Sequence, residues 1–160
     1  MANTEPTEHT LIPELYVNVS AAKWFSASSD VLGSVQGSFP SGPTEDQQFL
    51  DLGCGPGNIT REVLLPQCLP CRRLVAVDSS EDMLKYARER FSHPKIFYDT
   101  LDIVSGDLSA FVGRYGLFDR VYALSLLNWL KDQEQALKNI SHLMKPGGEL
   151  SLFSAPATRT

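Results

Sequence analysis

Residues 48–57, with the sequence QFLDLGCGPG, carry the pattern that decides the fold. The short apolar run from Phe49 to Leu52 predicts a buried strand that ends at a glycine turn. Glycines in such a turn let the backbone bend tightly and approach a ligand with no Cβ in the way. The following residues, Asn58 to Leu65, suit a short helix, which Pro66 is expected to end.

This alternation of strand and helix continues along the chain. Further short apolar runs predict strands at Leu74–Val77, Ile96–Tyr98, Arg120–Ser125 and Leu150–Phe153. Two segments between them show apolar residues at helical spacing: Met83, Leu84, Ala87 and Phe91, and then Ala136, Leu137, Ile140, Leu143 and Met144. A motif that resembles a capping box, Ser79-x-x-Asp82, precedes the first helix, and Pro146-Gly147-Gly148 is expected to stop the second. The pattern predicts an α/β fold, a doubly wound parallel sheet covered on both faces.

The first 46 residues lack this alternation. The first ten residues suit a tail, and Leu11 to Gln36 predicts a weak helix or a pair of turns, interrupted by Pro13 and Gly33. Residues 37–46 are dense in Gly, Pro and Ser, as in a hinge loop. We therefore expect residues 1–46 to form a tail, helix and hinge, and residues 47–160 to form the ligand-binding domain.

Composition disfavours several classes of protein. The chain has 160 residues, enough for one domain, and its net charge of −5 with no long basic run disfavours nucleic acid as a partner. No apolar run reaches the roughly 20 residues that span a bilayer, and the N-terminus lacks the features of a signal peptide. Three cysteines, an odd number, predict reduced thiols and a cytoplasmic location. Cys68-x-x-Cys71 has no second pair to complete a zinc site, so no metal is predicted.

The glycine turn indicates the charge of its ligand. Its glycines, at 53, 55 and 57, form G-x-G-x-G, whereas a dinucleotide fingerprint would place the third glycine at position 58, which is Asn58. Asp51 puts a carboxylate at the mouth of the turn, where it would repel a pyrophosphate and attract a cationic sulfonium that bears an ammonium group. The alternative is a strand–helix turn with no ligand.

A second acid stands at the end of the second predicted strand. Asp78 lies 21 residues after Gly57, close to the spacing of about 20 residues expected for an acid that binds ribose hydroxyls. The alternative is an acid that only stabilises the start of a helix through the helix dipole.

The combined motifs resemble a known family. DLGCGPG, VAVDSS, LDI, FDRVYALS and LKNISHLMKPGGEL, spread from Gln48 to Phe153, are similar in order and spacing to class I S-adenosylmethionine-dependent methyltransferases, which have a Rossmann-like fold. The resemblance implies S-adenosylmethionine as cofactor. It places the methionine moiety over the glycine turn, with Asp51 near its amino group, the ribose at Asp78 and the adenine between later residues. The implied cofactor-binding residues are Asp51, Gly53, Cys54, Gly55, Gly57, Asp78, Ser79, Met83, Asp102, Ile103, Leu124 and Ser125.

Several of these residues also have a purely structural interpretation. Met83, Ile103 and Leu124 could belong to the core, Ser79 could cap a helix, and Asp102 could be a solvated loop acid.

A closer resemblance is to the arthropod juvenile hormone acid O-methyltransferases. It rests on LYVNVS, NITREVLLPQCLP, VDSSEDMLKYARERF and SLLNWLKDQEQALKNI. It implies that Trp129 contacts the substrate carboxylate, although Asn128 replaces the usual His and no Gln stands near Ala22 and Lys23. The implied acceptor is a small hydrophobic carboxylic acid. A carboxylate is already ionised at neutral pH, so no general base and no catalytic residue are assigned.

The resemblance also implies an antiparallel hairpin after the fifth strand, and the chain stops at Thr160. The expectation is therefore a methyltransferase domain that lacks this hairpin. Two alternatives stay open: a cofactor-binding fragment or pseudoenzyme without catalysis, and a methyltransferase acting on another small molecule. A nicotinamide oxidoreductase is disfavoured by Asp51 and Asn58.

Overall fold

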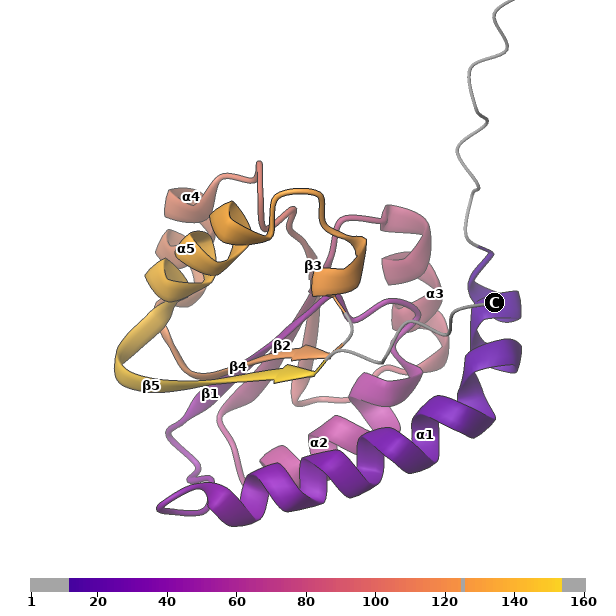
Figure 1. Cartoon of the computed structure of the whole chain (residues 1–160), viewed down its shortest axis with the longest axis horizontal. Helices are drawn as coiled ribbons and strands as arrows, with labels where there is room; N and C mark the ends of the chain where they lie inside the picture. Colours follow the sequence, from indigo (N-terminus) through magenta and orange to yellow (C-terminus); the bar gives the residue numbers. More distant parts are fainter. Residues whose placement is uncertain (1–11, 125, 154–160) are drawn as a thin grey trace, which may run out of the picture.

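The computed structural model describes residues 12–124 and 126–153, and in them it has three layers (Figure 1). Five parallel strands form one sheet in the order β3-β2-β1-β4-β5, which confirms the predicted Rossmann-like doubly wound architecture. The strands are β1 (Gln48–Leu52), β2 (Arg73–Asp78), β3 (Ile96–Thr100), β4 (Phe118–Leu124) and β5 (Met144–Phe153). The helices are α1 (Pro13–Ser38), α2 (Leu65–Cys68), α3 (Glu81–Arg90), α4 (Leu108–Tyr115) and α5 (Gln133–Leu143), with a π turn η1 (Thr60–Leu64) and a 3-10 turn η2 (Leu127–Trp129).

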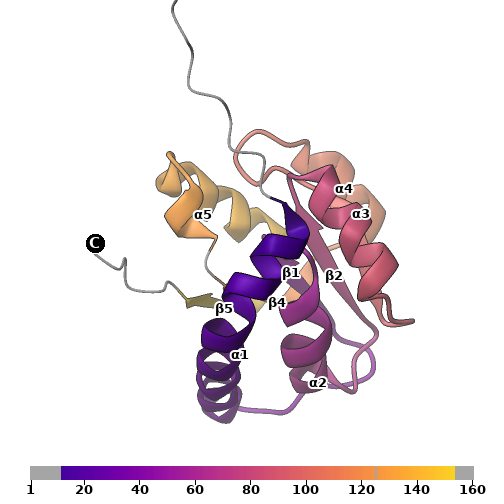
Figure 2. The ribbon, with the colours of Figure 1, turned by 90° about the vertical axis from the view of Figure 1, so that its right-hand side faces the viewer.

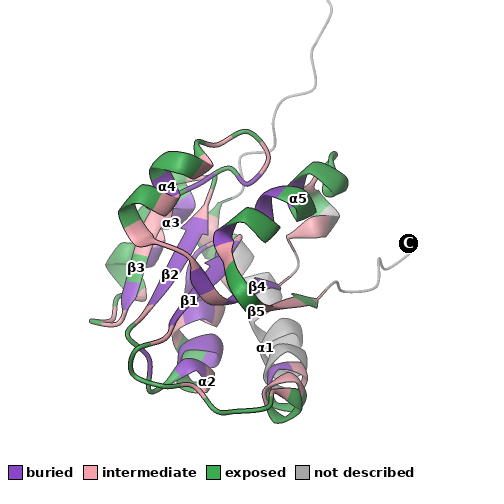
Figure 3. Cartoon of the chain, turned by 90° about the vertical axis from the view of Figure 1, so that its left-hand side faces the viewer, coloured by how far each residue is buried: buried purple, intermediate pink, exposed green. Residues whose placement is uncertain are grey.

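The two faces of the sheet carry separate apolar clusters. On one face, Leu32 of α1, the η1–α2 segment and Leu84 of α3 pack against alternate strand residues such as Phe49 (Figure 2). On the other face, α4 and α5 contribute Phe111 and Ile140. Figure 3 shows the central strands buried and the outer sides of α4 and α5 exposed. No helix in residues 12–124 and 126–153 has the length and apolar character that a membrane span needs.

The N-terminal helix corrects one expectation. Of the two predicted alternatives the helix forms, but neither Pro13 nor Gly33 interrupts it, and α1 runs unbroken from Pro13 to Ser38. Pro13 stands in the first turn, where a missing N–H costs no hydrogen bond. Gly33 is exposed and penalises the helix by only about 1 kcal/mol, while its neighbour Leu32 is buried in the core.

The helix after the glycine turn does not end at Pro66, as the sequence suggested. It continues to Cys68, because Pro66 lies in the first turn of α2. The preceding turn is a wide π turn, in which the Leu65 N–H donates to the Thr60 carbonyl five residues back. Pro66 has no N–H to donate, so it fits beside a turn that has left the α-helical register.

The start of β5 also differs from expectation. The helix ends at Leu143, and Met144, predicted on its stripe, already pairs with Phe118 in the sheet. The Pro146-Gly147-Gly148 segment therefore does not end the helix, as the sequence suggested. It lies inside β5 at an irregularity in the register, where Gly147 has a φ of +76°. Similarly, β4 begins at Phe118, two residues before the predicted start.

The helix α4 was not predicted, although its signals stand in the sequence. Leu108, Phe111, Val112 and Tyr115 follow helical spacing, and the Asp107 carboxylate caps the helix by accepting the Ala110 N–H at 2.9 Å.

Candidate cofactor site

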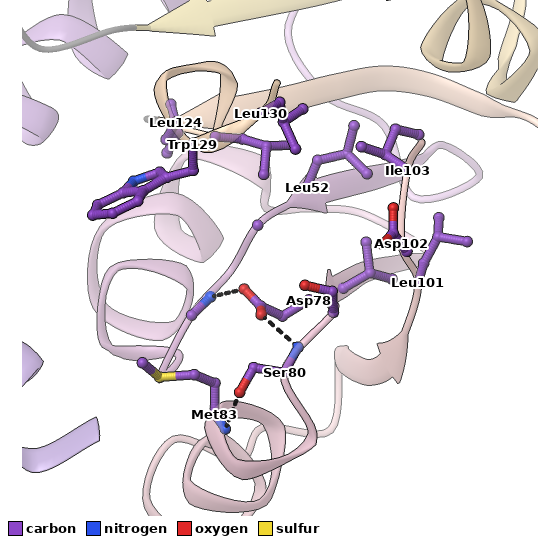
Figure 4. A pocket seen from close by; sticks show the side chains of 15 residues that line it. Leu52, Asp78, Ser80, Met83, Leu101, Asp102, Ile103, Leu124, Trp129 and Leu130 are labelled. Atoms are coloured by element: carbon purple, nitrogen blue, oxygen red, sulfur yellow. Dashed lines mark hydrogen bonds between the residues drawn. The ribbon is translucent and has the colours of Figure 1, made fainter. Parts of the chain in front are cut away.

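A pocket of about 270 Å³ opens at the carboxyl ends of β1, β2 and β4 (Figure 4). In the sheet, β2 and β3 lie on one side of β1, and β4 and β5 lie on the other, so the strand order reverses between β1 and β4. The carboxyl ends of the strands at such a reversal are the usual ligand position in a doubly wound sheet. The pocket is lined by Leu52, Gly53, Gly55, Val77, Asp78, Ser79, Ser80, Met83, Leu101, Asp102, Ile103, Leu124, Leu126, Trp129 and Leu130.

The glycine turn forms one wall, and its three glycines serve different purposes. All have positive φ, at +72° for Gly53, +55° for Gly55 and +86° for Gly57. A Cβ on Gly57 would come within 2.7 Å of both the Ala87 Cβ and the Tyr98 hydroxyl, so this glycine allows packing. A Cβ on Gly55 would meet no atom within 4 Å, so the backbone there faces open space. Gly55 is therefore the point where a ligand can approach the main chain.

Asp78 connects the glycine turn to the start of α3. One carboxylate oxygen accepts the Gly55 N–H at 2.9 Å, and the other accepts the Ser80 N–H at 2.9 Å (Figure 4). The Ser80 hydroxyl in turn accepts the Met83 N–H at 3.3 Å. The N-cap of α3 is therefore Ser80 and not Ser79, which corrects the predicted capping box by one residue. Each Asp78 oxygen keeps a second lone pair for a ligand hydroxyl.

Asp51 lies behind the turn rather than at its mouth, where the sequence suggested it. Only 3% of the surface of Asp51 is exposed, and the residue does not line the pocket. The carboxylate accepts a hydrogen bond from the Thr60 hydroxyl at 2.7 Å. Burial raises the pKa of Asp51 from its ordinary 3.8 to about 6, while the Thr60 hydrogen bond lowers it and nearby Asp78 raises it.

The other predicted residues divide into two groups. The pocket brings together Gly53, Gly55, Asp78, Ser79, Met83, Asp102, Ile103, Leu124 and Trp129. Cys54 and Gly57 stay outside its lining, and Cys54 is buried. Ser125 lies outside the described residues. The Asp102 carboxylate accepts the N–H groups of Val104 and Ser105, and these bonds lower the pKa of Asp102.

Sequence reasoning missed six lining residues. Leu52 ends β1 and Val77 is the next-to-last residue of β2, and their position beside the glycine turn and Asp78 could have indicated them. Ser80 and Leu101 follow strands in the same way. Leu126 and Leu130 carry no such signal, because only the path of the chain around η2 brings them over the pocket. Leu126 lies so close to the turn that its Cδ1 would be 2.9 Å from a Cβ on Gly53.

The described lining fits a cationic, partly apolar cofactor such as S-adenosylmethionine. It includes two carboxylates, Asp78 and Asp102, and no Lys, Arg or His. A sulfonium with an ammonium group is favoured by such a wall, and a pyrophosphate is disfavoured. Met83 and Ile103 offer apolar side chains beside Asp78, where a ribose hydroxyl and an adjoining base could lie.

Comparison with known proteins identifies the family. The model of a methyltransferase domain matches residues 50–150. The chain is 37% identical over 106 residues to juvenile hormone acid O-methyltransferase of Bombyx mori, covering 66% of this chain and 37% of that one. It is 35% identical over 108 residues to trans-aconitate 2-methyltransferase of Variovorax paradoxus, covering 68% and 38%. The chain thus spans little more than a third of the length of these curated relatives.

Solved structures agree on the fold. An amino pentose methyltransferase from Micromonospora echinaspora, solved with S-adenosylmethionine bound, superposes with a TM-score of 0.65 at 22% identity, over 96% of this chain and 60% of that one. An N-methyltransferase from Bradyrhizobium japonicum gives 0.64 at 25% identity, over 85% and 71%. With the family model matching more than half of its length, the chain belongs to the class I S-adenosylmethionine-dependent methyltransferases.

Proposed function

We propose that the protein transfers a methyl group from S-adenosylmethionine to a small hydrophobic carboxylic acid, and that it acts in the cytoplasm. The three cysteines, which are free and buried, support a reducing compartment. The names of two relatives, a juvenile hormone acid O-methyltransferase and a trans-aconitate 2-methyltransferase, support an acid as acceptor.

One observation carries the choice of acceptor. Among the described lining residues, the only titratable side chains are Asp78 and Asp102, and both are already engaged with backbone N–H groups. An alcohol or phenol acceptor needs a base to remove its proton, whereas a carboxylate is ionised at neutral pH and attacks directly. A described lining without a free base therefore favours a carboxylate.

The acceptor side of the pocket supports a hydrophobic body. Leu124, Leu126, Leu130 and Trp129 form an apolar group at the end of β4, and Trp129 is 68% exposed. We propose that the Trp129 indole N–H holds the acceptor carboxylate. Because no cationic side chain is among the described lining residues, a single carboxylate is favoured over a tricarboxylate such as trans-aconitate.

We propose cofactor roles for the remaining residues as the family resemblance suggests. Gly53, Cys54, Gly55 and Gly57 would form the turn beside the methionine moiety, with Leu124 and Ser125 near its end. Asp78 would accept the ribose hydroxyls, and the adenine would lie among Ser79, Met83, Asp102 and Ile103. When bound, the cofactor supplies an electrophilic methyl group. The chain contributes orientation and the exclusion of water rather than proton transfer.

The test is an assay with isotope-labelled S-adenosylmethionine on the protein that contains this chain. The acceptor panel pairs a farnesoic-type acid with the matching alcohol and adds trans-aconitate. We expect label only in the ester of the hydrophobic acid. Transfer to the alcohol at a similar rate would contradict the choice of acceptor. Cofactor binding without transfer to any acceptor would instead favour a non-catalytic protein.

A further inference from the structure

Asp51 and Thr60 form a buried pair behind the glycine turn. Asp51 lies in β1 with 3% of its surface exposed, and Thr60, the first residue of η1, is fully buried. The Thr60 hydroxyl donates to the Asp51 carboxylate at 2.7 Å. A carboxylate this deeply buried is costly to ionise unless something compensates its charge.

The other groups around Asp51 do not supply that compensation. Asp78, at the end of β2, has the same charge and raises the pKa of Asp51. Three further groups interact electrostatically with Asp51: the thiols of Cys54 and Cys68 and the phenol of Tyr98. Burial raises the pKa of each of them, so they are neutral and carry no compensating charge. Among the described residues, the Thr60 hydroxyl is the influence that favours the charged form of Asp51.

We propose that Thr60 is a positioning residue for cofactor binding, whose hydroxyl keeps the Asp51 carboxylate ionised behind the glycine turn. The negative charge then stands on the side of the turn opposite the pocket, where it attracts the ammonium and sulfonium groups of the cofactor. The inference rests on the proposed function for its ligand. The hydrogen bond between Thr60 and Asp51 forms within the protein and involves no ligand.

The variants separate charge from shape. Thr60→Val keeps the volume and removes the hydrogen bond, and Thr60→Ser keeps the bond. The matched control is Thr44→Val, because the Thr44 hydroxyl also donates to a carboxylate, that of Asp46, at 2.7 Å in an exposed loop. Asp51→Asn, alone and combined with Thr60→Val, removes the titrating group.

The first readout is the affinity for S-adenosylmethionine by calorimetry between pH 5 and 7.5. The ligand amino group titrates near 8, so each value is read as a ratio to the wild type at the same pH. We expect Thr60→Val to move the midpoint up by about one pH unit, and therefore to bind about threefold more weakly near pH 6.5 and close to tenfold more weakly near pH 5. Thr60→Ser and Thr44→Val should bind S-adenosylmethionine as the wild type does at each pH. In the Asp51→Asn background, Thr60→Val should cause no further pH dependence of this affinity.

The second readout needs no ligand. Carbon-13 NMR follows the titration of the Asp51 carboxyl group, whose midpoint should rise in Thr60→Val and stay in place in Thr60→Ser. An unmoved midpoint, or an equal loss of affinity at every pH, would overturn the proposal. If the wild type binds no cofactor, the proposed function fails and the cofactor role of Thr60 with it, whereas the NMR titration still decides whether Thr60 keeps Asp51 ionised.

Discussion

At the scale of single residues, Asp78 joins the glycine turn to the start of α3. Its two oxygens fix the Gly55 N–H on one side and the Ser80 N–H on the other. We expect Asp78→Ala to weaken S-adenosylmethionine binding by about 1.5–3 kcal/mol, the range for hydrogen bonds to a charged group. Calorimetry measures the dissociation constant directly. An unchanged constant would mean that Asp78 only supports the start of α3.

Two glycines of the same turn should respond differently to alanine. Gly57→Ala should lower the free energy of unfolding by about 2–4 kcal/mol, because the new Cβ collides with Ala87 and Tyr98 at a positive φ. Gly55→Ala should cost about 1–2 kcal/mol through its positive φ alone, but it should block ligand approach. Urea unfolding and calorimetry on both variants test this contrast. Equal stabilities would contradict it.

Asp51 should make stability depend on pH. Its pKa is raised in the folded protein, so the folded state binds more protons than the unfolded state between about pH 4 and 6. The Asp51 contribution to stability therefore falls as pH rises through this window and stays low above it. Asp51→Asn should be more stable than the wild type by about 1–3 kcal/mol at pH 7.5, with little difference at pH 4. A constant difference across this range, measured by urea unfolding, would refute the assignment.

At the scale of elements, the sequence predicts what is continuous and apolar. β1 and β2 can be predicted because burial on both faces requires nearly continuous apolar runs, which in β1 only Asp51 interrupts between Phe49 and Leu52. The bulge in β5 is not visible, because it depends on how Glu149 pairs with Arg120 across the sheet. The π turn before Pro66 is equally hidden, since a proline in sequence reads as a helix end.

The same distinction holds within the site. Asp78 could be predicted because its distance from the glycine turn is set by one strand–helix–strand unit. Leu126 could not, because its contact with Gly53 depends on the fold of the η2 segment. The burial of Asp51 was missed as well, since its partner Thr60 belongs to the irregular turn.

At the scale of the whole molecule, Arg120 joins the N-terminal segment to the sheet. Its buried guanidinium donates to the Gln36 side chain and the Ser41 carbonyl, lies 3.4 Å from the Glu149 carboxylate, and stands 3.8 Å from the centre of the Phe39 ring. Replacement by methionine would leave these acceptors without their donor. We expect Arg120→Met to lose about 1–3 kcal/mol of unfolding free energy, since Glu149 is partly exposed. Unaltered urea unfolding would show that the contacts contribute nothing.

The central claim is that the pocket at the carboxyl ends of β1, β2 and β4 binds S-adenosylmethionine. The most direct measurement is calorimetry with S-adenosylmethionine, its demethylated product and NAD on the same protein sample. The account predicts saturable binding of both sulfur ligands and none of NAD, because the described lining has two carboxylates and no cation to meet a pyrophosphate. Tight binding of NAD with no response to either sulfur ligand would contradict it.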